Sequence, residues 1–74
     1  MDERDLEGGE RINGFVIVRN RDGDLHALRG GAISGLSNTD GSTVVALYGG
    51  RCLIVDRPLL TVLSWFGPGV GMPR

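Results

Sequence analysis

The stretch STVVALYGGRCLIVDRPLLTVLSWF, residues 42–66, decides the fold because it contains both a β-hairpin and a helix. Two runs of β-branched and aliphatic residues, Thr43–Tyr48 and Arg51–Val55, flank the pair Gly49-Gly50. Two glycines suit the positive φ angles of a two-residue hairpin turn, so we predict such a turn here. The predicted register pairs Tyr48 with Arg51, Leu47 with Cys52, Ala46 with Leu53, Val45 with Ile54 and Val44 with Val55.

A helix is predicted directly after this hairpin. Its apolar positions recur at helical spacing and are Leu59, Val62, Leu63 and Phe66. Asp56 or Arg57 is expected to cap the helix, and Pro58 suits its first turn. Alternate hairpin residues point to opposite faces, and both predicted faces are apolar, so Cys52 is expected to be a small buried hydrophobe. The helix covers one face. The other face is covered by closure of a small barrel, by a second copy or by a partner protein, so a monomer and a homodimer both remain open.

The first half of the chain reads as further strands joined by short turns. Two strands are predicted on either side of the turn residues 20–24, at Phe15–Arg19 and Asp24–Leu28. A third short strand, Ala32–Leu36, is predicted after the break at Gly30-Gly31. A polar loop over residues 37–41 then returns the chain to the hairpin. We therefore predict a mainly β (α+β) fold: a small antiparallel β-meander of four to five strands, a partly closed barrel, with one short C-terminal helix.

The chain divides into three parts by composition. Residues 1–11 are polar and carry five acids, which predicts a flexible acidic N-terminal arm. Residues 12–66 are the single β-meander plus helix domain, since 74 residues make at most one domain. Residues 67–74 are rich in glycine and proline and are predicted to be a flexible tail.

Composition argues against several classes of protein. No apolar run approaches the length of a membrane span and the N-terminus is acidic, so we expect a cytoplasmic protein with no membrane partner. The chain has no lysine, which a Walker phosphate-binding loop requires, and it has one cysteine and one histidine. We therefore expect no catalytic residue, no bound cofactor and no metal site, and we predict that the protein is not an enzyme.

All eight basic residues are arginines. The guanidinium group suits planar contacts to phosphates and carboxylates, but a coding bias toward Arg, Gly, Ala and Val is the favoured explanation of the composition. The candidate partner-binding residues are Arg19, Arg21, Arg29, Arg51 and Arg57. Arginines gathered on one side of the sheet would favour nucleic-acid binding, whereas scattered arginines would favour a protein partner.

The pattern over residues 16–66 resembles the small flagellar and swarming-motility proteins of the FlbD type. The matching positions are Arg21 to Gly23 in the first turn, Leu28, Ile33, Thr43–Leu47, Gly50, Val55 and the helix around Val62-Leu63. This resemblance implies a small accessory or regulatory β-meander protein of bacteria or phage, and it implies no catalytic residue.

These observations predict a non-enzymatic regulatory interaction protein that binds a larger bacterial protein machine, in the transcription or motility apparatus. The alternative is an arginine-based nucleic-acid-binding module. Only four residues are aromatic and three of them are expected in the core, so a base-stacking platform is difficult to build.

Overall fold

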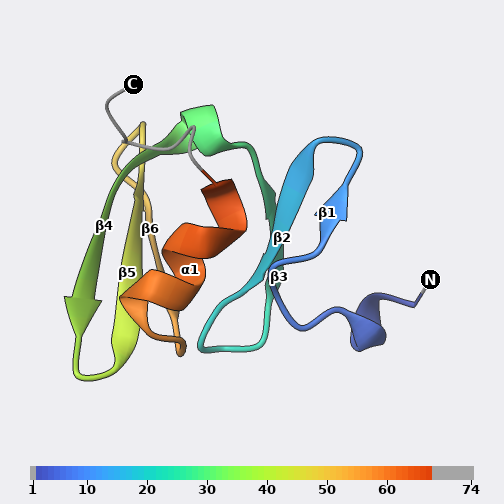
Figure 1. Ribbon diagram of the computed structural model, residues 1–74, viewed down its shortest axis with the longest axis horizontal. Helices are drawn as coiled ribbons and strands as arrows, with labels where there is room; N and C mark the ends of the chain where they lie inside the picture. The colour runs from blue at the N-terminus through green and yellow to red at the C-terminus, as the bar shows by residue number, and fades with distance from the viewer. Residues whose placement is uncertain (1, 68–74) are drawn as a thin grey trace.

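The computed structural model describes residues 2–67 and contains two three-stranded antiparallel sheets with one α-helix (Figure 1). The first sheet has the strand order β1-β2-β3 and the second β4-β5-β6. The strands are β1 (Arg11–Ile12), β2 (Phe15–Arg19), β3 (Leu25–Leu28), β4 (Ile33–Thr39), β5 (Ser42–Leu47) and β6 (Cys52–Val55). Two 3-10 turns, η1 (Glu3–Asp5) and η2 (Gly30–Ala32), precede β1 and β4, and the helix α1 (Leu59–Phe66) follows β6.

The predicted fold class is confirmed: the chain is a mainly β, antiparallel meander with a C-terminal helix. Each strand pairs with its neighbour in sequence except at η2, where the chain passes from the first sheet to the second. The described part of the chain has six strands, against the four to five predicted, because the short β1 adds one. Its two sheets do not close into the partly closed barrel that was expected.

One core fills the space between the two sheets and the helix, and Figure 1 shows α1 lying between them. The fully buried side chains come from both sheets and from the helix, so the two sheets and α1 share this core. They are Val18, Val45, Val55, Val62 and Thr43. The first sheet also contributes Val16 and Leu28, so the two sheets depend on each other for burial.

The register of the β5–β6 hairpin differs from the prediction by one residue. Val45 lies opposite Leu53 and Ala46 opposite Cys52, and the Leu47 N–H donates to the Arg51 carbonyl over 2.8 Å. The connection is therefore a three-residue loop that includes Tyr48 before the two glycines, and both Gly49 and Gly50 have positive φ. The two-residue turn was wrong because the glycines occupy the second and third loop positions.

A shift of one residue exchanges the faces of one strand relative to the other. Val45, Leu53 and Val55 consequently share the inner face and are buried, whereas Cys52 and Ile54 point outward and are exposed. The expectation that Cys52 is buried was therefore wrong. The hairpin has one core face and one outer face, so the helix already covers the face that needs burial.

The helix α1 has the predicted apolar stripe. Val62 and Phe66 are buried and Leu59 and Leu63 are half-buried, while Leu60 is 76% exposed. The predicted side-chain cap is absent because Pro58 occupies the N-cap position and makes no side-chain hydrogen bond. No helix within residues 2–67 is long and apolar enough to cross a membrane.

The segment before β1, expected to be a flexible arm, packs on the domain. The Leu6 side chain is buried, and the backbone of residues 9–10 exchanges hydrogen bonds with Ile17 of 2.7 and 2.8 Å. Gly8 and Gly9 pass close to the ring of Trp65, and the Arg11 guanidinium donates to the Trp65 carbonyl over 2.6 Å. These contacts join the N-terminal segment to both β2 and α1. The predicted tail lies, apart from Gly67, outside the described residues.

Candidate functional site

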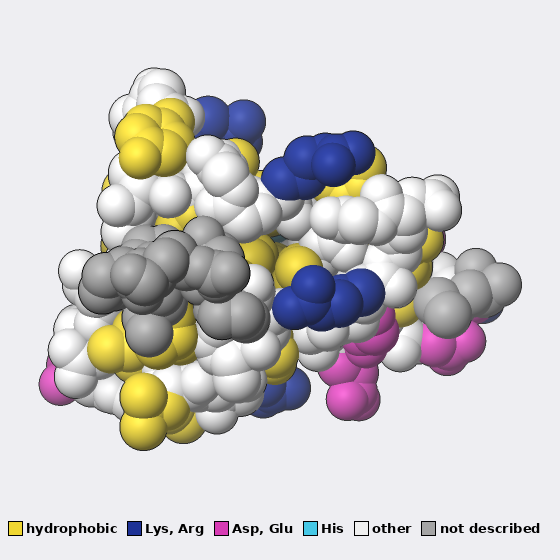
Figure 2. Space-filling model, turned by 45° about the horizontal axis from the view of Figure 1, so that its top comes forward, with side chains coloured by type: hydrophobic (Ala, Val, Ile, Leu, Met, Phe, Trp, Pro, Cys, Tyr) yellow, Lys and Arg dark blue, Asp and Glu magenta, His cyan; other side chains and the backbone are white. Residues whose placement is uncertain are grey.

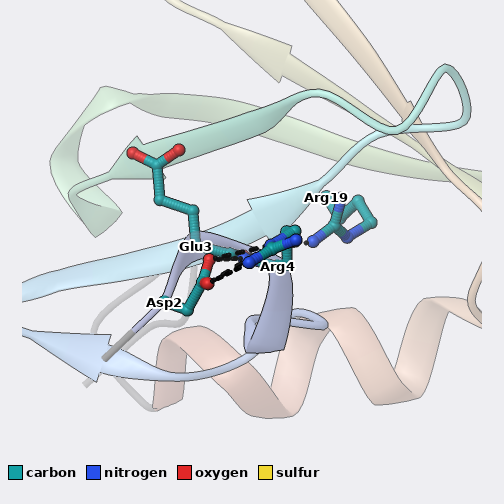
Figure 3. A network of polar contacts seen from close by, with 4 residues as sticks. All are labelled: Asp2, Glu3, Arg4 and Arg19. Atoms are coloured by element: carbon teal, nitrogen blue, oxygen red, sulfur yellow. Dashed lines mark hydrogen bonds and ion pairs between the residues drawn. The ribbon is translucent and has the colours of Figure 1, made fainter.

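Arg19, at the end of β2, donates hydrogen bonds from its guanidinium to backbone carbonyl groups of its own chain. Its Nε and Nη2 atoms donate to the Leu6 carbonyl over 3.1 and 2.5 Å, and its Nη1 atom donates to the Gly23 carbonyl over 2.8 Å. A weaker bond of 3.4 Å reaches the Glu3 carbonyl. In Figure 3 the neighbouring Arg4 faces the carboxylate of Asp2, with which it forms an exposed ion pair of 2.8 Å. Arg19 therefore anchors the N-terminal segment to the first sheet.

Arg21, in the turn after β2, joins the two sheets. Its guanidinium lies 2.9 Å from the Asp56 carboxylate, and the same carboxylate accepts a 2.7 Å hydrogen bond from the Ser42 hydroxyl. The Arg21 N–H also donates to the carbonyl of Ile54 over 2.7 Å. The hydrogen bonds from Arg21 and Ser42 lower the pKa of Asp56 below its ordinary value of 3.8. Arg21 thus has a structural partner in the second sheet.

The other three candidates are spread over different elements. The Arg29 guanidinium lies over the Phe15 ring, 4.3 Å from its centroid, which is a cation–π contact. Arg51 is exposed in the β5–β6 loop, and Arg57 is exposed between β6 and α1. Among the five candidates, only the side chains of Arg51 and Arg57 make no hydrogen bond, ion pair or cation–π contact within residues 2–67, and they lie at opposite ends of β6.

Three of the arginines surround a shallow depression between the two sheets. Its volume is about 110 Å³, and its lining residues are Glu7, Arg19, Asn20, Arg21, Val55, Asp56 and Arg57. Two acids face the three arginines, so the lining is of mixed charge. A pocket for a small molecule usually has several hundred cubic ångströms, so this depression is too small to enclose one.

On the face that Figure 2 shows, the charges do not form a continuous basic surface. Figure 2 shows basic side chains spaced over one face, and acidic side chains grouped at the end that carries the N-terminal segment. The sequence criterion for a nucleic-acid interface was a gathering of arginines on one side of the sheet. Arg19 and Arg21 instead bind carbonyl and carboxylate groups of the same chain, which leaves them few donors for phosphate groups. Arg29 lies over the Phe15 ring and keeps its N–H donors.

A second surface combines exposure with an absence of charge. No residue of β4, β5 or β6 is charged. Asp40 and Arg51 lie in the connections between these strands, and the Arg21–Asp56 ion pair lies at one end of the sheet, where both side chains contact the Ser42 hydroxyl. We define the outer face of the second sheet as the side chains that point away from the core, namely Ser37, Val44, Ala46, Cys52 and Ile54. Ser37 and Cys52 are exposed, and Ile54 is 38% exposed. Depletion of charge is the compositional feature of interface centres.

Sequence reasoning missed this surface because it depends on the hairpin register. With the predicted register, Val44 would share a face with Leu53 and Val55, which are both buried. With the observed register, Val44 lies opposite Ile54 and Ala46 opposite Cys52, on the outer side. The signal that sequence does carry is the run from Ile33 to Val55, in which only Asp40 and Arg51 are charged.

The comparisons with known proteins add no relative: no family model, no curated protein and no solved structure matches the chain. The resemblance to the FlbD type therefore stays a prediction. Among residues 2–67, the His, Cys, Asp and Glu side chains form no group of three that could hold a metal ion.

Proposed function

We propose that this protein is a non-enzymatic regulatory interaction protein that binds a larger bacterial protein machine, in the transcription or motility apparatus of the cytoplasm. The observation that carries the proposal is the uncharged outer face of the second sheet, where Ile54, Cys52 and Val44 lie together. An exposed sheet face with aliphatic side chains and no charge suits a protein surface, because burial of its apolar area is favourable and no ion must be desolvated.

The arginine contacts support a protein partner over a nucleic acid. Phosphate recognition needs cationic side chains that are free to exchange counterions, and Arg19 and Arg21 are committed to carbonyl and carboxylate groups of the chain itself. Tyr48, 71% exposed at the tip of the β5–β6 hairpin, is the most exposed aromatic residue of the described chain. A single exposed ring does not provide the successive platforms on which bases stack.

Affinity capture with matched variants tests this proposal. Ile54→Asp puts a charge on the outer face, and Leu60→Asp puts the same charge on an exposed aliphatic position of α1. We expect wild type and Leu60→Asp to retain the same protein partner from a bacterial lysate and Ile54→Asp to lose it. Circular dichroism checks that both variants are folded. Equal capture by the folded Ile54→Asp variant would contradict the proposed surface.

A nuclease treatment separates the two classes of partner. Capture through a protein surface survives nuclease, whereas an arginine-based nucleic-acid complex is lost and weakens steeply as salt is raised. Replacement of Arg51 and Arg57 by alanine, the two candidates whose side chains make no polar or cation–π contact in residues 2–67, is then expected to leave capture unchanged. Loss of capture in that double variant would favour the nucleic-acid alternative.

A further inference from the structure

The strand β4 forms an open edge of the second sheet. The sheet order places β5 on one side of β4, and no strand of the described chain pairs with its other side. In Figure 1, β4 lies at the border of the molecule, on the side away from the first sheet. With seven residues it is also the longest strand among residues 2–67. An edge strand presents a row of backbone N–H and C=O groups that can pair with another strand.

This edge lacks most of the devices by which proteins protect such edges. The β4 sequence ISGLSNT contains no lysine, no other charged residue and no proline. A register irregularity between Ile33 and Gly35 disturbs only the first part of the strand. The remaining residues, Leu36–Thr39, pair regularly with β5. An uncharged edge with a regular register is open to pairing with another strand.

The turn after β4 determines which backbone groups face this edge. Asp40 and Gly41 both have positive φ, 47° and 82°, as in a two-residue type I′ turn, so Thr39 and Ser42 form the hydrogen-bonded pair. Hydrogen-bonded and non-hydrogen-bonded pairs alternate along an antiparallel ladder. Ser37 therefore bonds toward β5, and the backbone groups of Leu36 and Asn38 point outward from the sheet edge.

We propose that two copies of the chain pair their β4 strands antiparallel about a two-fold axis at Ser37, which makes one continuous six-stranded sheet. In this register Leu36 of one copy lies opposite the partner's Asn38, and each such pair exchanges two backbone hydrogen bonds. The outward groups of Leu36 and Asn38 are placed symmetrically about Ser37, so each edge is complementary to itself, as a two-fold interface requires.

Charge favours a second copy as the occupant. In a two-fold pairing of identical strands, any charged side chain lies close to a charge of the same sign on the other copy. Like charges directly opposite each other are destabilising in a sheet. β4 carries no charge, so the two edges meet without repulsion. Pairing also joins the two outer faces, which doubles the uncharged surface around Val44 and Ile54. The inference stands on the edge of β4 and does not depend on the proposed partner.

Sedimentation with a proline variant tests the pairing. Proline at Asn38 removes an N–H that faces the open edge, a position where edge strands tolerate proline, so the monomer fold is retained. We expect wild type to sediment at twice the 7.9 kDa mass of the chain and Asn38→Pro to sediment as a folded monomer. A monomeric wild type, or a folded Asn38→Pro that remains dimeric, would overturn the proposal.

A disulfide crosslink keeps the test decisive if Asn38→Pro fails to fold. At a non-hydrogen-bonded antiparallel pair the Cα atoms lie about 4.5 Å apart, within the range of a disulfide. The double variant Ser37→Cys, Cys52→Ser is expected to form a covalent dimer with oxidised glutathione. The control Asp22→Cys, Cys52→Ser, with its thiol in the exposed β2–β3 turn, is expected to stay monomeric. Equal crosslinking of the two variants, or none at Ser37→Cys, would contradict the two-fold pairing.

Discussion

Gly9 lies directly against the ring of Trp65: a Cβ atom built on Gly9 would stand 2.7 Å from the Trp65 Nε1 atom. Gly9 also has a φ of +92°, which other residues rarely adopt. The close approach and the backbone conformation therefore both require glycine. Through this contact the N-terminal segment reaches α1, the last element of the described chain.

Gly9→Ala is expected to lower the free energy of unfolding by about 2–3 kcal/mol, because the added methyl group collides with Trp65 in a strained backbone. Urea denaturation followed by the fluorescence of Trp65, the one tryptophan of the chain, measures this loss. Gly31→Ala is the matched control, since its φ is ordinary and nothing lies within 4 Å of its Cβ position. Equal stability of the two variants would show that residues 8–9 do not rest on the helix.

Leu6→Ala tests whether the N-terminal segment belongs to the folded unit. Leu6 is buried, so truncation of its side chain is expected to cost about 2–3 kcal/mol. Leu60→Ala removes the same atoms from an exposed site and is expected to change stability by less than about 0.5 kcal/mol. Thermal and urea unfolding compare the two. A neutral Leu6→Ala would support the flexible arm that composition predicted.

The Asp56 carboxylate makes stability depend on pH through its bonds to Arg21 and Ser42. Its pKa is lowered on folding, so its contribution is present above the ordinary value of 3.8 and is lost as the pH falls through the lowered pKa. We expect wild type to be more stable than Asp56→Asn near neutral pH and the difference to shrink on acidification below 3.8. Urea unfolding over a series of pH values measures it.

Asp22→Asn provides the control for this titration. Asp22 is exposed in the β2–β3 turn, and the same change of charge there removes no ion pair found in residues 2–67. Its stability relative to wild type is expected to vary less with pH than that of Asp56→Asn. If both variants follow wild type in parallel over the whole acid range, the Arg21–Asp56 contact does not link the two sheets energetically.

The sequence predicted the fold class because its strong signals are local. The runs of β-branched and aliphatic residues in Phe15–Arg19 and Ser42–Leu47, and the helical spacing of Val62 and Phe66, depend on neighbours in the chain. The hairpin loop was less determined, since Gly49-Gly50 fits both a two-residue and a three-residue connection. The two-residue loop was predicted, and its register assigned the wrong residues to the two faces of the hairpin. The outer face was therefore not recognised from the sequence.

The N-terminal segment was misjudged for a different reason. Its acids and glycines have the composition of a mobile terminus, yet its contacts are with residues distant in sequence. Arg19 donates to the Leu6 carbonyl, and Gly8 and Gly9 lie on Trp65. No local sequence pattern predicts that a glycine is required because a distant ring lies against it. The contacts of Arg19 and Arg21 could not be predicted for the same reason, because their partners are distant in sequence.

Alkylation of Cys52 tests most directly whether the outer face of the second sheet is the surface that a partner covers. Cys52 is exposed there, beside Ile54 on the same strand. We expect it to react rapidly in the purified native protein, whereas the thiol of the control Val45→Cys, Cys52→Ser, at a fully buried position, is protected until the chain unfolds. In the complex captured from cells, Cys52 is expected to become protected. A thiol protected in the purified protein, or one that reacts equally fast in the complex, would contradict the account.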